Sequence, residues 1–469
     1  MRRTKLVCTI GPACDSEEML RALFEAGLNV ARINFSHGDS NYHRLLIRRI
    51  KSLRDQMGMP VAILQDLQGP KIRVGKIESG TLWLGRGTTF VLTSSPTPGD
   101  RLGIGVSLEN FHEEVEVGAR VLLADGTIEL LVERIEPPDV YCRVVVEGVL
   151  SSNQGVNLPA ARMELESLTE KDLHDLAVGL EEGVDAIALS FVRSEKDIGV
   201  LRRAVHAAGS DVPIIAKIEK PQAVDNVDSI LEAADGVMIA RGDLGLEIDL
   251  VRVPLVQKMI IRKANAIGKP VITATQMLVR MVDNPRPTRA ETADVANAIL
   301  DGTDAVMLSE ETAVGSYPLE AAQMMHRIAS EVESGVDEGM FRWELDGETM
   351  VSDAISRSAH NIARGTGANA IITPTWSGST PRLVARFRPS QTIIAATPNK
   401  AVVYFLSFCW GIVPLLIDSA DTTDDQFSLA VDGAKNAGWV QSGDLVVITG
   451  GTPLHIPGTT NFIRVERVV

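Results

Sequence analysis

The stretch PIIAKIEKPQAVDNVDSILEAADGVMIAR, residues 213–241, contains one complete unit of the fold. Its two ends, 213–219 and 236–241, are short apolar runs rich in β-branched residues, which predict buried strands. The segment between them, 222–234, repeats apolar residues at helical spacing. It therefore predicts the crossover helix that joins two parallel strands.

The same alternation recurs along the chain. Strand-like segments occupy 5–10, 30–35, 61–67, 186–191, 213–219, 236–241, 270–275 and 305–309. Helical periodicity lies between them, as in 16–26, 42–57, 222–234, 253–267 and 288–300. Eight such units predict an α/β protein with a (β/α)₈ TIM barrel, whose strands all end on one face, where barrel enzymes keep their chemistry.

Two regions depart from this alternation. From Ile72 to Pro159 the pattern becomes strands and tight turns, with an Asp125-Gly126 hairpin signal, and predicts an inserted β-barrel lid. Helical periodicity returns at Thr169, an expected N-cap with Asp172 three residues later. Beyond a charged link that starts after Val332 and runs through Gly347, a separate α/β domain has strand candidates at 370–373, 392–396, 413–417, 445–449 and 462–465. We expect the barrel at 1–69 and 168–335, the lid at 70–167 and the C-terminal domain at 345–469.

Composition narrows the function classes. The chain has 469 residues and a formal net charge of -15, which argues against nucleic acid or an anionic membrane as a partner. Its four cysteines form no C-x-x-C pair, so neither a disulfide framework nor a zinc site is indicated. No apolar run approaches the ~20 residues of a membrane helix. We expect a cytoplasmic protein.

Charged residues at neighbouring strand ends indicate a metal site. Strand alternation places Lys217 and Glu219 on the same side, and the next strand ends near Asp243 between glycines. Two carboxylates suit Mg²⁺ or Mn²⁺, which prefer oxygen ligands. Taken singly, the Lys-x-Glu pair reads as an ordinary ion pair and Gly-Asp-x-Gly as a turn.

Other strand ends supply phosphate ligands and hydroxyl groups. Arg32 and Arg73 offer paired donors for phosphate oxygens, and Asp66 lies at the end of the third strand. The alternative for the Asn-Phe-Ser-His-Gly turn after Arg32 is a capped helix start. Thr275 and Ser309, at successive strand ends, could bind a carboxylate or position a water.

With these stretches in view, the whole chain resembles the pyruvate kinases. The strings that carry the resemblance are Thr9-Ile10-Gly11-Pro12, Arg32-Ile33-Asn34-Phe35-Ser36-His37-Gly38, Gly69-Pro70-Lys71-Ile72-Arg73, Ala216-Lys217-Ile218-Glu219, Ala240-Arg241-Gly242-Asp243-Leu244-Gly245, Thr273-Ala274-Thr275-Gln276-Met277-Leu278 and Met307-Leu308-Ser309-Glu310-Glu311-Thr312. The resemblance implies a barrel interrupted by a mobile lid, a C-terminal regulatory domain and a homotetramer.

The resemblance also implies a reaction, in which phosphoenolpyruvate and ADP give pyruvate and ATP. Its carried-over roles are a metal site at Glu219 and Asp243, substrate binding by Lys217, Gly242, Asp243 and Thr275, nucleotide binding by Arg32, Asn34, His37 and Arg73, and catalysis by Lys217, Arg32, Arg73, Thr275 and Ser309. The cofactor would be Mg²⁺ or Mn²⁺. Two other classes stay open: a metal-dependent aldolase or lyase, and a non-catalytic metabolite sensor.

Three positions depart from the commoner family pattern. Leu67 stands where most members have Thr, and Lys71 where they have Glu, while Glu310 replaces a frequent Gly. The family's potassium site would then survive only as a remnant made of Asn34, Ser36, Asp66 and Lys71. We expect that K⁺ is not required.

The C-terminal domain contains a hydroxyl- and glycine-rich turn at Thr375-Trp376-Ser377-Gly378-Ser379-Thr380, between a predicted strand and helix. Such a turn could cradle a phosphate, and its alternative is a plain loop. The family's activators bind at the matching turn, through Thr375, Ser377, Gly378, Ser379 and Thr380. The later loop 450–458 contains no Arg for a second phosphate, which favours a sugar monophosphate or AMP as the effector.

Overall fold

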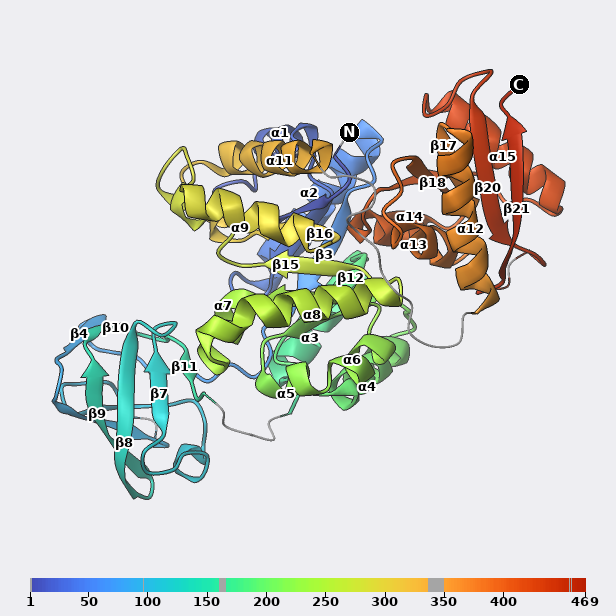
Figure 1. The fold of residues 1–469 in the computed structure, drawn as a ribbon. Coiled ribbons are helices and arrows are strands. Elements are labelled where there is room, and N and C mark those ends of the chain that lie inside the picture. Colours follow the sequence, from blue (N-terminus) through green and yellow to red (C-terminus); the bar gives the residue numbers. More distant parts are fainter. Residues whose placement is uncertain (1, 96, 160–165, 336–349, 455, 457) are drawn as a thin grey trace.

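The computed structural model describes residues 2–95, 97–159, 166–335, 350–454, 456 and 458–469. Three bodies lie in a row, with a β-rich lid at one end, an α/β barrel in the middle and an α/β domain at the other end (Figure 1). The expected link between Val332 and Gly347 lies mostly outside the described residues, as does the segment 160–165 of the lid's return connection.

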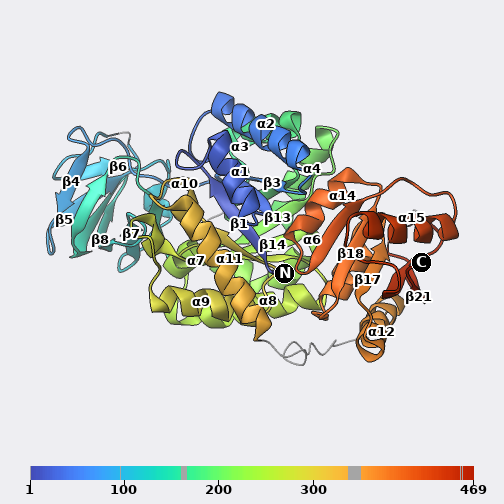
Figure 2. The ribbon, with the colours of Figure 1, turned by 90° about the horizontal axis from the view of Figure 1, so that it is seen from above.

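The central body is a closed parallel barrel. Its strands, in ring order, are β1 (Lys5–Ile10), β16 (Ala305–Leu308), β15 (Val271–Ala274), β14 (Gly236–Ala240), β13 (Ile214–Ile218), β12 (Ala186–Leu189), β3 (Ala62–Asp66) and β2 (Val30–Asn34). Every strand is predicted to within two residues of its observed ends. The strands are buried because helices cover the outside of the ring and side chains fill the inside (Figure 2).

Helices follow the strands as expected. They are α1 (Glu17–Glu25), α2 (Ser40–Met57), α3 (Glu170–Glu182), α4 (Glu195–Ala207), α5 (Pro221–Asp225), α6 (Val227–Ala233), α7 (Arg241–Glu247), α8 (Val253–Ala266), α9 (Arg289–Leu300), α10 (Glu310–Ala313) and α11 (Pro318–Ser334). Thr169 and Asp172 form the capping box that starts α3. The prediction of a single helix at 222–234 is wrong. Asn226 leaves helical geometry (ψ 18°), and its side-chain Nδ2 donates to the Arg193 carbonyl at 2.9 Å. This residue separates α5 from α6.

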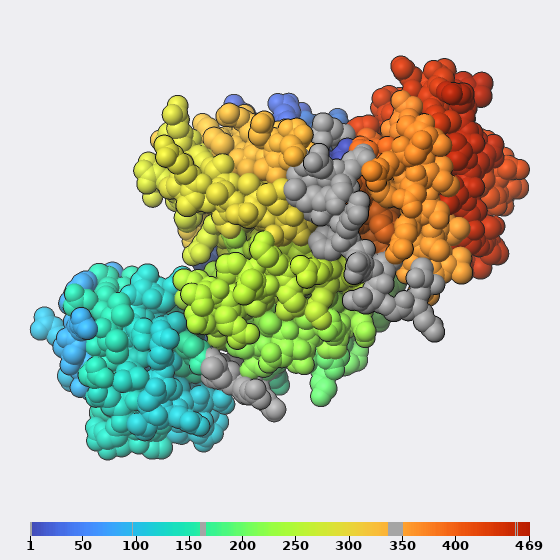
Figure 3. All heavy atoms as spheres, viewed as in Figure 1, coloured from blue at the N-terminus to red at the C-terminus, as the bar shows by residue number. Residues whose placement is uncertain are grey.

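The lid is built from β4 (Thr81–Leu84), β5 (Thr89–Thr93), β6 (Gly103–Gly105), β7 (Arg120–Leu123), β8 (Ile128–Glu136), β9 (Asp139–Val146), β10 (Gly148–Ser151) and β11 (Val156–Asn157). The predicted Asp125-Gly126 turn joins β7 to β8, with φ values of 50° and 81°. The described strands pair as a six-stranded and a two-stranded sheet around one apolar core, rather than as one hydrogen-bonded ring. The lid forms a separate lobe beside the barrel (Figure 3).

The C-terminal domain contains α12 (Val351–Thr366), β17 (Ala370–Pro374), α13 (Ser379–Ala385), β18 (Thr392–Thr397), α14 (Lys400–Phe405), β19 (Ile412–Leu416), α15 (Thr423–Asn436), β20 (Leu445–Gly451) and β21 (Thr460–Arg467). The sheet order is β19-β18-β17-β20-β21, and only β21 is antiparallel.

The C-terminal domain packs on the barrel end opposite the strand C-termini. There Lys5 Nζ donates to the Ile412 carbonyl at 2.7 Å, and Arg388 pairs with Asp304 at 3.2 Å. Among the described residues, none of the helices has both the length and the apolar character needed to cross a membrane.

Candidate active site

Lys217 lies at the centre of the charged cluster at the barrel mouth. Its Nζ lies 2.9 Å from Glu219 Oε1 and 3.3 Å from Asp66 Oδ1, and it donates to Ser190 Oγ at 2.7 Å. Alternation along β13 turns Lys217 and Glu219 to the same side, as predicted. The Lys217 side chain is only 11% exposed, so these charges interact with little screening by water.

Arg32 completes the cluster from β2. Its Nε donates to Asp66 Oδ2 at 2.6 Å and its Nη1 to Thr9 Oγ1 at 2.7 Å. Burial raises the pKa of the Asp66 carboxyl, but Lys217 and Arg32 outweigh burial and hold that pKa below its ordinary value. Burial lowers the pKa of Lys217, and Asp66 and Glu219 more than reverse this effect. The site therefore keeps a fixed ammonium and a fixed guanidinium at neutral pH.

Glu219 and Asp243 are two carboxylates whose negative charges are only partly neutralised by neighbouring cations. Burial raises the pKa of Glu219, and although Lys217 opposes this, the nearby charge of Asp243 raises it further. The Phe191 N–H fixes the Glu219 side chain by donating to Oε2 at 2.7 Å. Among the described residues, no group of three or more His, Cys, Asp or Glu side chains gathers in a metal-like arrangement. A divalent ion held by this pair would complete its coordination with water or substrate oxygens.

The turn after β15 meets the start of α7. Thr275 Oγ1 accepts from the Gly242 N–H at 2.7 Å, and Thr275 and Gln276 have φ values of 68° and 53°. This left-handed conformation, which few residues other than glycine adopt, is typical of residues held in place for function. Gly242 and Asp243 belong to a short helix rather than to the turn expected from Gly-Asp-x-Gly alone.

Arg241 braces this turn instead of facing the charged cluster. Its guanidinium donates to the Thr275 carbonyl at 2.9 Å and pairs with Asp294 at 2.7 Å. The structure shows that it holds Thr275 in place, because α7 begins at Arg241 and turns its side chain toward α9.

Ser309 lies at the end of β16. Its Oγ is buried and has no hydrogen-bond partner among the described residues, while its N–H donates to Glu311 Oε2 at 2.7 Å. Glu311 Oε1 accepts from the Leu278 N–H at 3.0 Å. Glu311 therefore ties the turn that contains Thr275 to the one that contains Ser309.

Asn34, Ser36, His37 and Arg73 lie at the outer rim. Asn34 Oδ1 accepts from the Ser36 N–H at 3.1 Å. Burial lowers the pKa of His37, and the charges of Arg73, Arg32 and Lys71 lower it further, so these cations surround His37. Arg73 also donates to the Asn153 carbonyl in the lid at 2.9 Å. The rim is therefore suited to an anionic ligand shared by barrel and lid.

Lys71 does not pair with Asp66, beside which it was expected. Its Nζ lies 3.9 Å from Asp243 Oδ1 and 3.7 Å from Asp125 Oδ1 of the lid hairpin. Asp66 is already paired with Arg32 and Lys217. The chain from Gly69 leads away from β3 into the lid, which places Lys71 beside Asp243 instead.

The turn 375–380 and the described residues Gly451, Pro453, Leu454, Ile456 and Gly458 line one open cavity in the C-terminal domain. The Gly378 N–H donates to Thr375 Oγ1 at 3.0 Å, and Thr380 Oγ1 lies 2.6 Å from Thr460 Oγ1. The described residues that line the cavity include hydroxyl and amide groups but no Lys, Arg or His.

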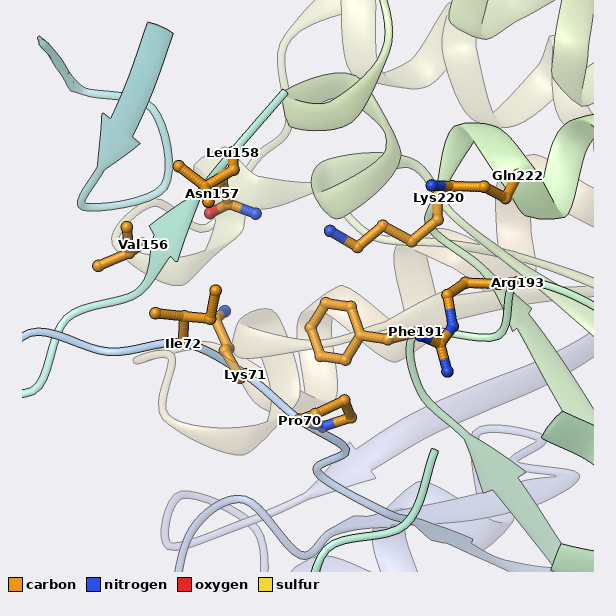
Figure 4. Close-up of a pocket in the computed structure, with 10 residues that line it drawn as sticks. All are labelled: Pro70, Lys71, Ile72, Val156, Asn157, Leu158, Phe191, Arg193, Lys220 and Gln222. Carbon is orange, nitrogen blue, oxygen red and sulfur yellow. The ribbon is translucent and has the colours of Figure 1, made fainter. Parts of the chain in front are cut away.

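Sequence reasoning missed a second cluster at the lid hinge. Lys220, Asn157 and Glu247 meet there. Lys220 and Asn157 also line an open cavity together with Phe191 (Figure 4). The available signal was spacing, since Lys220 directly follows Glu219 and Glu247 comes one helical turn after Asp243.

Comparisons with known proteins show what the whole chain is similar to. Residues 1–322 match the family model described as the barrel domain of pyruvate kinase, and residues 353–466 match its alpha/beta domain. The chain is 48% identical over 471 residues to pyruvate kinase 2 of Synechocystis sp., covering 100% of this chain and 79% of that protein. It is 44% identical over 472 residues to the pyruvate kinase of Clostridium acetobutylicum, covering 100% of both. A crystal structure of a pyruvate kinase from Cryptosporidium parvum matches with a TM-score of 0.92 and 36% identity, over 100% of this chain and 96% of that one.

Proposed function

The chain belongs to the pyruvate kinase family, and from this premise we infer that its barrel mouth transfers the phosphoryl group of phosphoenolpyruvate to ADP, giving pyruvate and ATP. The observation that carries the assignment is the placement of Lys217 between Asp66 and Glu219, with Arg32 on the far side of Asp66. Two fixed cations in a buried site stabilise charge that spreads over phosphoryl oxygens during transfer.

We assign Glu219 and Asp243 to a divalent metal, Mg²⁺ or Mn²⁺. The raised pKa of Glu219, caused by burial and by the charge of Asp243, supports this, because a cation would relieve both effects. When bound, such an ion neutralises charge on substrate oxygens. The Phe191 N–H that holds Glu219 would keep that carboxylate in position.

The substrate carboxylate is assigned to the backbone at Gly242 and Asp243 and to the hydroxyl of Thr275. Support comes from the bond between the Gly242 N–H and Thr275 Oγ1, which places a backbone donor and a hydroxyl together beside Asp243. After transfer, the enolate needs a proton. Ser309, whose buried hydroxyl has no other partner in the described chain, is suited to supply it through a relay with Thr275.

The nucleotide is assigned to the rim formed by Arg32, Asn34, His37 and Arg73. The positive charges of Arg73 and Arg32 both lower the pKa of His37, which supports a common anion-binding region. Arg73 belongs to the lid, where its guanidinium donates to the Asn153 carbonyl, so the region joins lid and barrel residues. Closure of the lid would exclude water from the transferring phosphoryl group.

We further propose that catalysis needs no K⁺. Lys71 lies 3.9 Å from Asp243 and so adds a fixed positive charge at the mouth, where it disfavours a second monovalent cation. Leu67 contributes no side-chain oxygen to the remnant formed by Asn34, Ser36 and Asp66. The positive charge of Lys71 acts through its contact with Asp243, and not through the contact with Asp66 that was expected from the sequence.

The turn that contains Thr375, Ser377, Gly378, Ser379 and Thr380 is proposed to bind a monophosphorylated effector, a sugar monophosphate or AMP. Its lining of hydroxyl groups without a described Lys or Arg supports one phosphate rather than two. Assembly as a homotetramer and a cytoplasmic location also follow from the family and are proposed on that ground.

The deciding experiment measures ATP and pyruvate formed from phosphoenolpyruvate and ADP with Mg²⁺. Equal amounts of both products support the proposed function. Pyruvate release from an aldol substrate, without ATP formation from phosphoenolpyruvate, would instead favour a lyase.

A further inference from the structure

A buried carboxylate joins the lid to the barrel. Glu247 Oε1 accepts from Asn157 Nδ2 of lid strand β11 at 3.1 Å and from Lys220 Nζ of the barrel at 2.7 Å. Figure 4 shows Asn157 and Lys220 reaching toward each other from the lid and barrel sides of the hinge cavity. One carboxylate therefore holds a group from each body.

The burial of these groups makes their geometry strict. The side chains of Glu247 and Lys220 are 1% and 13% exposed, so their ion pair is poorly screened. Asn157 Oδ1 and Glu247 Oε2 are also buried and have no hydrogen-bond partner among the described residues. Leaving two buried acceptors unpaired lowers the stability of the folded protein. We therefore infer that these residues serve to position the lid rather than to stabilise the fold.

The same short helix carries the metal-site carboxylate. Asp243 and Glu247 lie four residues apart in α7, so they project from the same side of it. The lid hairpin also meets α7, since a Cβ on Gly126 would lie 2.6 Å from Leu246 Cδ2. Lid contacts and the metal site are thus built on one seven-residue element.

We propose that Glu247 is a positioning residue that anchors the lid hinge to α7, through Asn157, and so aligns the lid with the phosphoryl-transfer site. Lys220 supplies the counter-charge to Glu247 in the hinge. This inference rests on the proposed function. It adds that loss of the anchor lets water compete with ADP: the P–O bond of phosphoenolpyruvate breaks, the phosphorus bonds to a water oxygen, and the enolate takes up a proton to give pyruvate and free phosphate.

The test exchanges acid and amide across the hinge. Asn157→Asp and Glu247→Gln are made singly and together, because the double variant restores one hydrogen bond and one negative charge beside Lys220. For each variant, pyruvate and ATP are measured separately, with kcat and KM for ADP, and folding is followed by circular dichroism. Glu129→Gln is the matched control, since Glu129 pairs with Arg120 inside the lid at 2.7 Å.

We expect each single variant to form more pyruvate than ATP and to lose about tenfold or more in kcat/KM for ADP. The double variant should recover to within about threefold of the wild type, and Glu129→Gln should match the wild type. The proposed anchor role would be overturned if the single variants fold and keep the wild-type ratio of pyruvate to ATP and the wild-type kinetics. It would also be overturned if the double variant keeps the defect of the single variants.

If a single variant does not fold, Asn157→Ala removes the donor alone. Excess pyruvate from that variant supports the anchor, and equal pyruvate and ATP contradicts it. ATP formation by the wild type tests the proposed function separately, so the two ideas fail in distinguishable ways.

Discussion

Lys217 Nζ lies 2.9 Å from Glu219 Oε1, so the cation assigned to the phosphoryl group contacts a carboxylate assigned to the metal. Both groups are buried, and each changes the pKa of the other: Glu219 raises that of Lys217, and Lys217 lowers that of Glu219 against the larger effect of burial. Removing either one therefore disturbs both parts of the site.

Lys217→Met and Glu219→Ala should each lose nearly all phosphoryl transfer while the protein stays folded. Loss of one positioned charge-stabilising group commonly costs ~2.7–4 kcal/mol of barrier, which is on the order of a hundredfold or more in kcat. Steady-state kinetics with circular dichroism checks this. Lys263→Met, which breaks an exposed pair with Asp228, is the control. Near-normal turnover in either site variant would remove the assigned role.

Wild-type activity should be the same in Na⁺, tetramethylammonium and K⁺ buffers that contain Mg²⁺. Lys71, 3.9 Å from Asp243, already provides a monovalent charge. Lys71→Glu combined with Leu67→Thr should create a K⁺ requirement, because it adds a carboxylate and a hydroxyl oxygen. The charge reversal Lys76→Glu, at an exposed lid position, controls for net charge. Strong activation of the wild type by K⁺ would contradict the proposal.

Sugar monophosphates or AMP should lower KM for phosphoenolpyruvate, and Ser377→Glu should abolish that response. The added carboxylate would repel a phosphate in the cavity that Ser377 lines. Titration of each compound against both proteins is the measurement, with Ser442→Glu, at an exposed site of the same domain, as control. Activation by fructose 1,6-bisphosphate alone would point to a different site.

The contribution of Lys5 to stability should rise between pH 8 and 10.5, because burial lowers its pKa from 10.5 to about 8. Below pH 8 the side chain is charged in both folded and unfolded chains. Above pH 8 the folded protein loses this proton first, so the unfolded state binds more protons and folding gains, by pH 10.5, on the order of 3 kcal/mol.

Lys5→Met should flatten this rise. Denaturation midpoints of both proteins between pH 7 and 10.5 provide the check, and the wild type should gain relative to Lys5→Met as pH rises. Parallel curves would show that Lys5 titrates normally in the folded protein.

Sequence alone determined the barrel and most of its mouth. Apolar strands that alternate with amphipathic helices form a closed barrel or an open doubly wound sheet, and eight successive units favour the barrel, whose parallel strands bring their C-termini to one face. Lys217, Glu219, Asp243 and Thr275 were therefore predictable as one site. The two-residue period of a strand also settled that Lys217 and Glu219 share a side.

Contacts between distant segments were decided only by the tertiary structure. Lys71 pairs with Asp243 rather than Asp66, Arg241 turns toward Asp294, and Asn226 divides a predicted helix by bonding to Arg193. Glu247 joins Asn157 and Lys220, which lie 90 and 27 residues away in the chain. Periodicity predicts which face of an element a residue occupies. The partner of a charged side chain depends instead on how separate elements pack, and local sequence does not encode the distance between such elements.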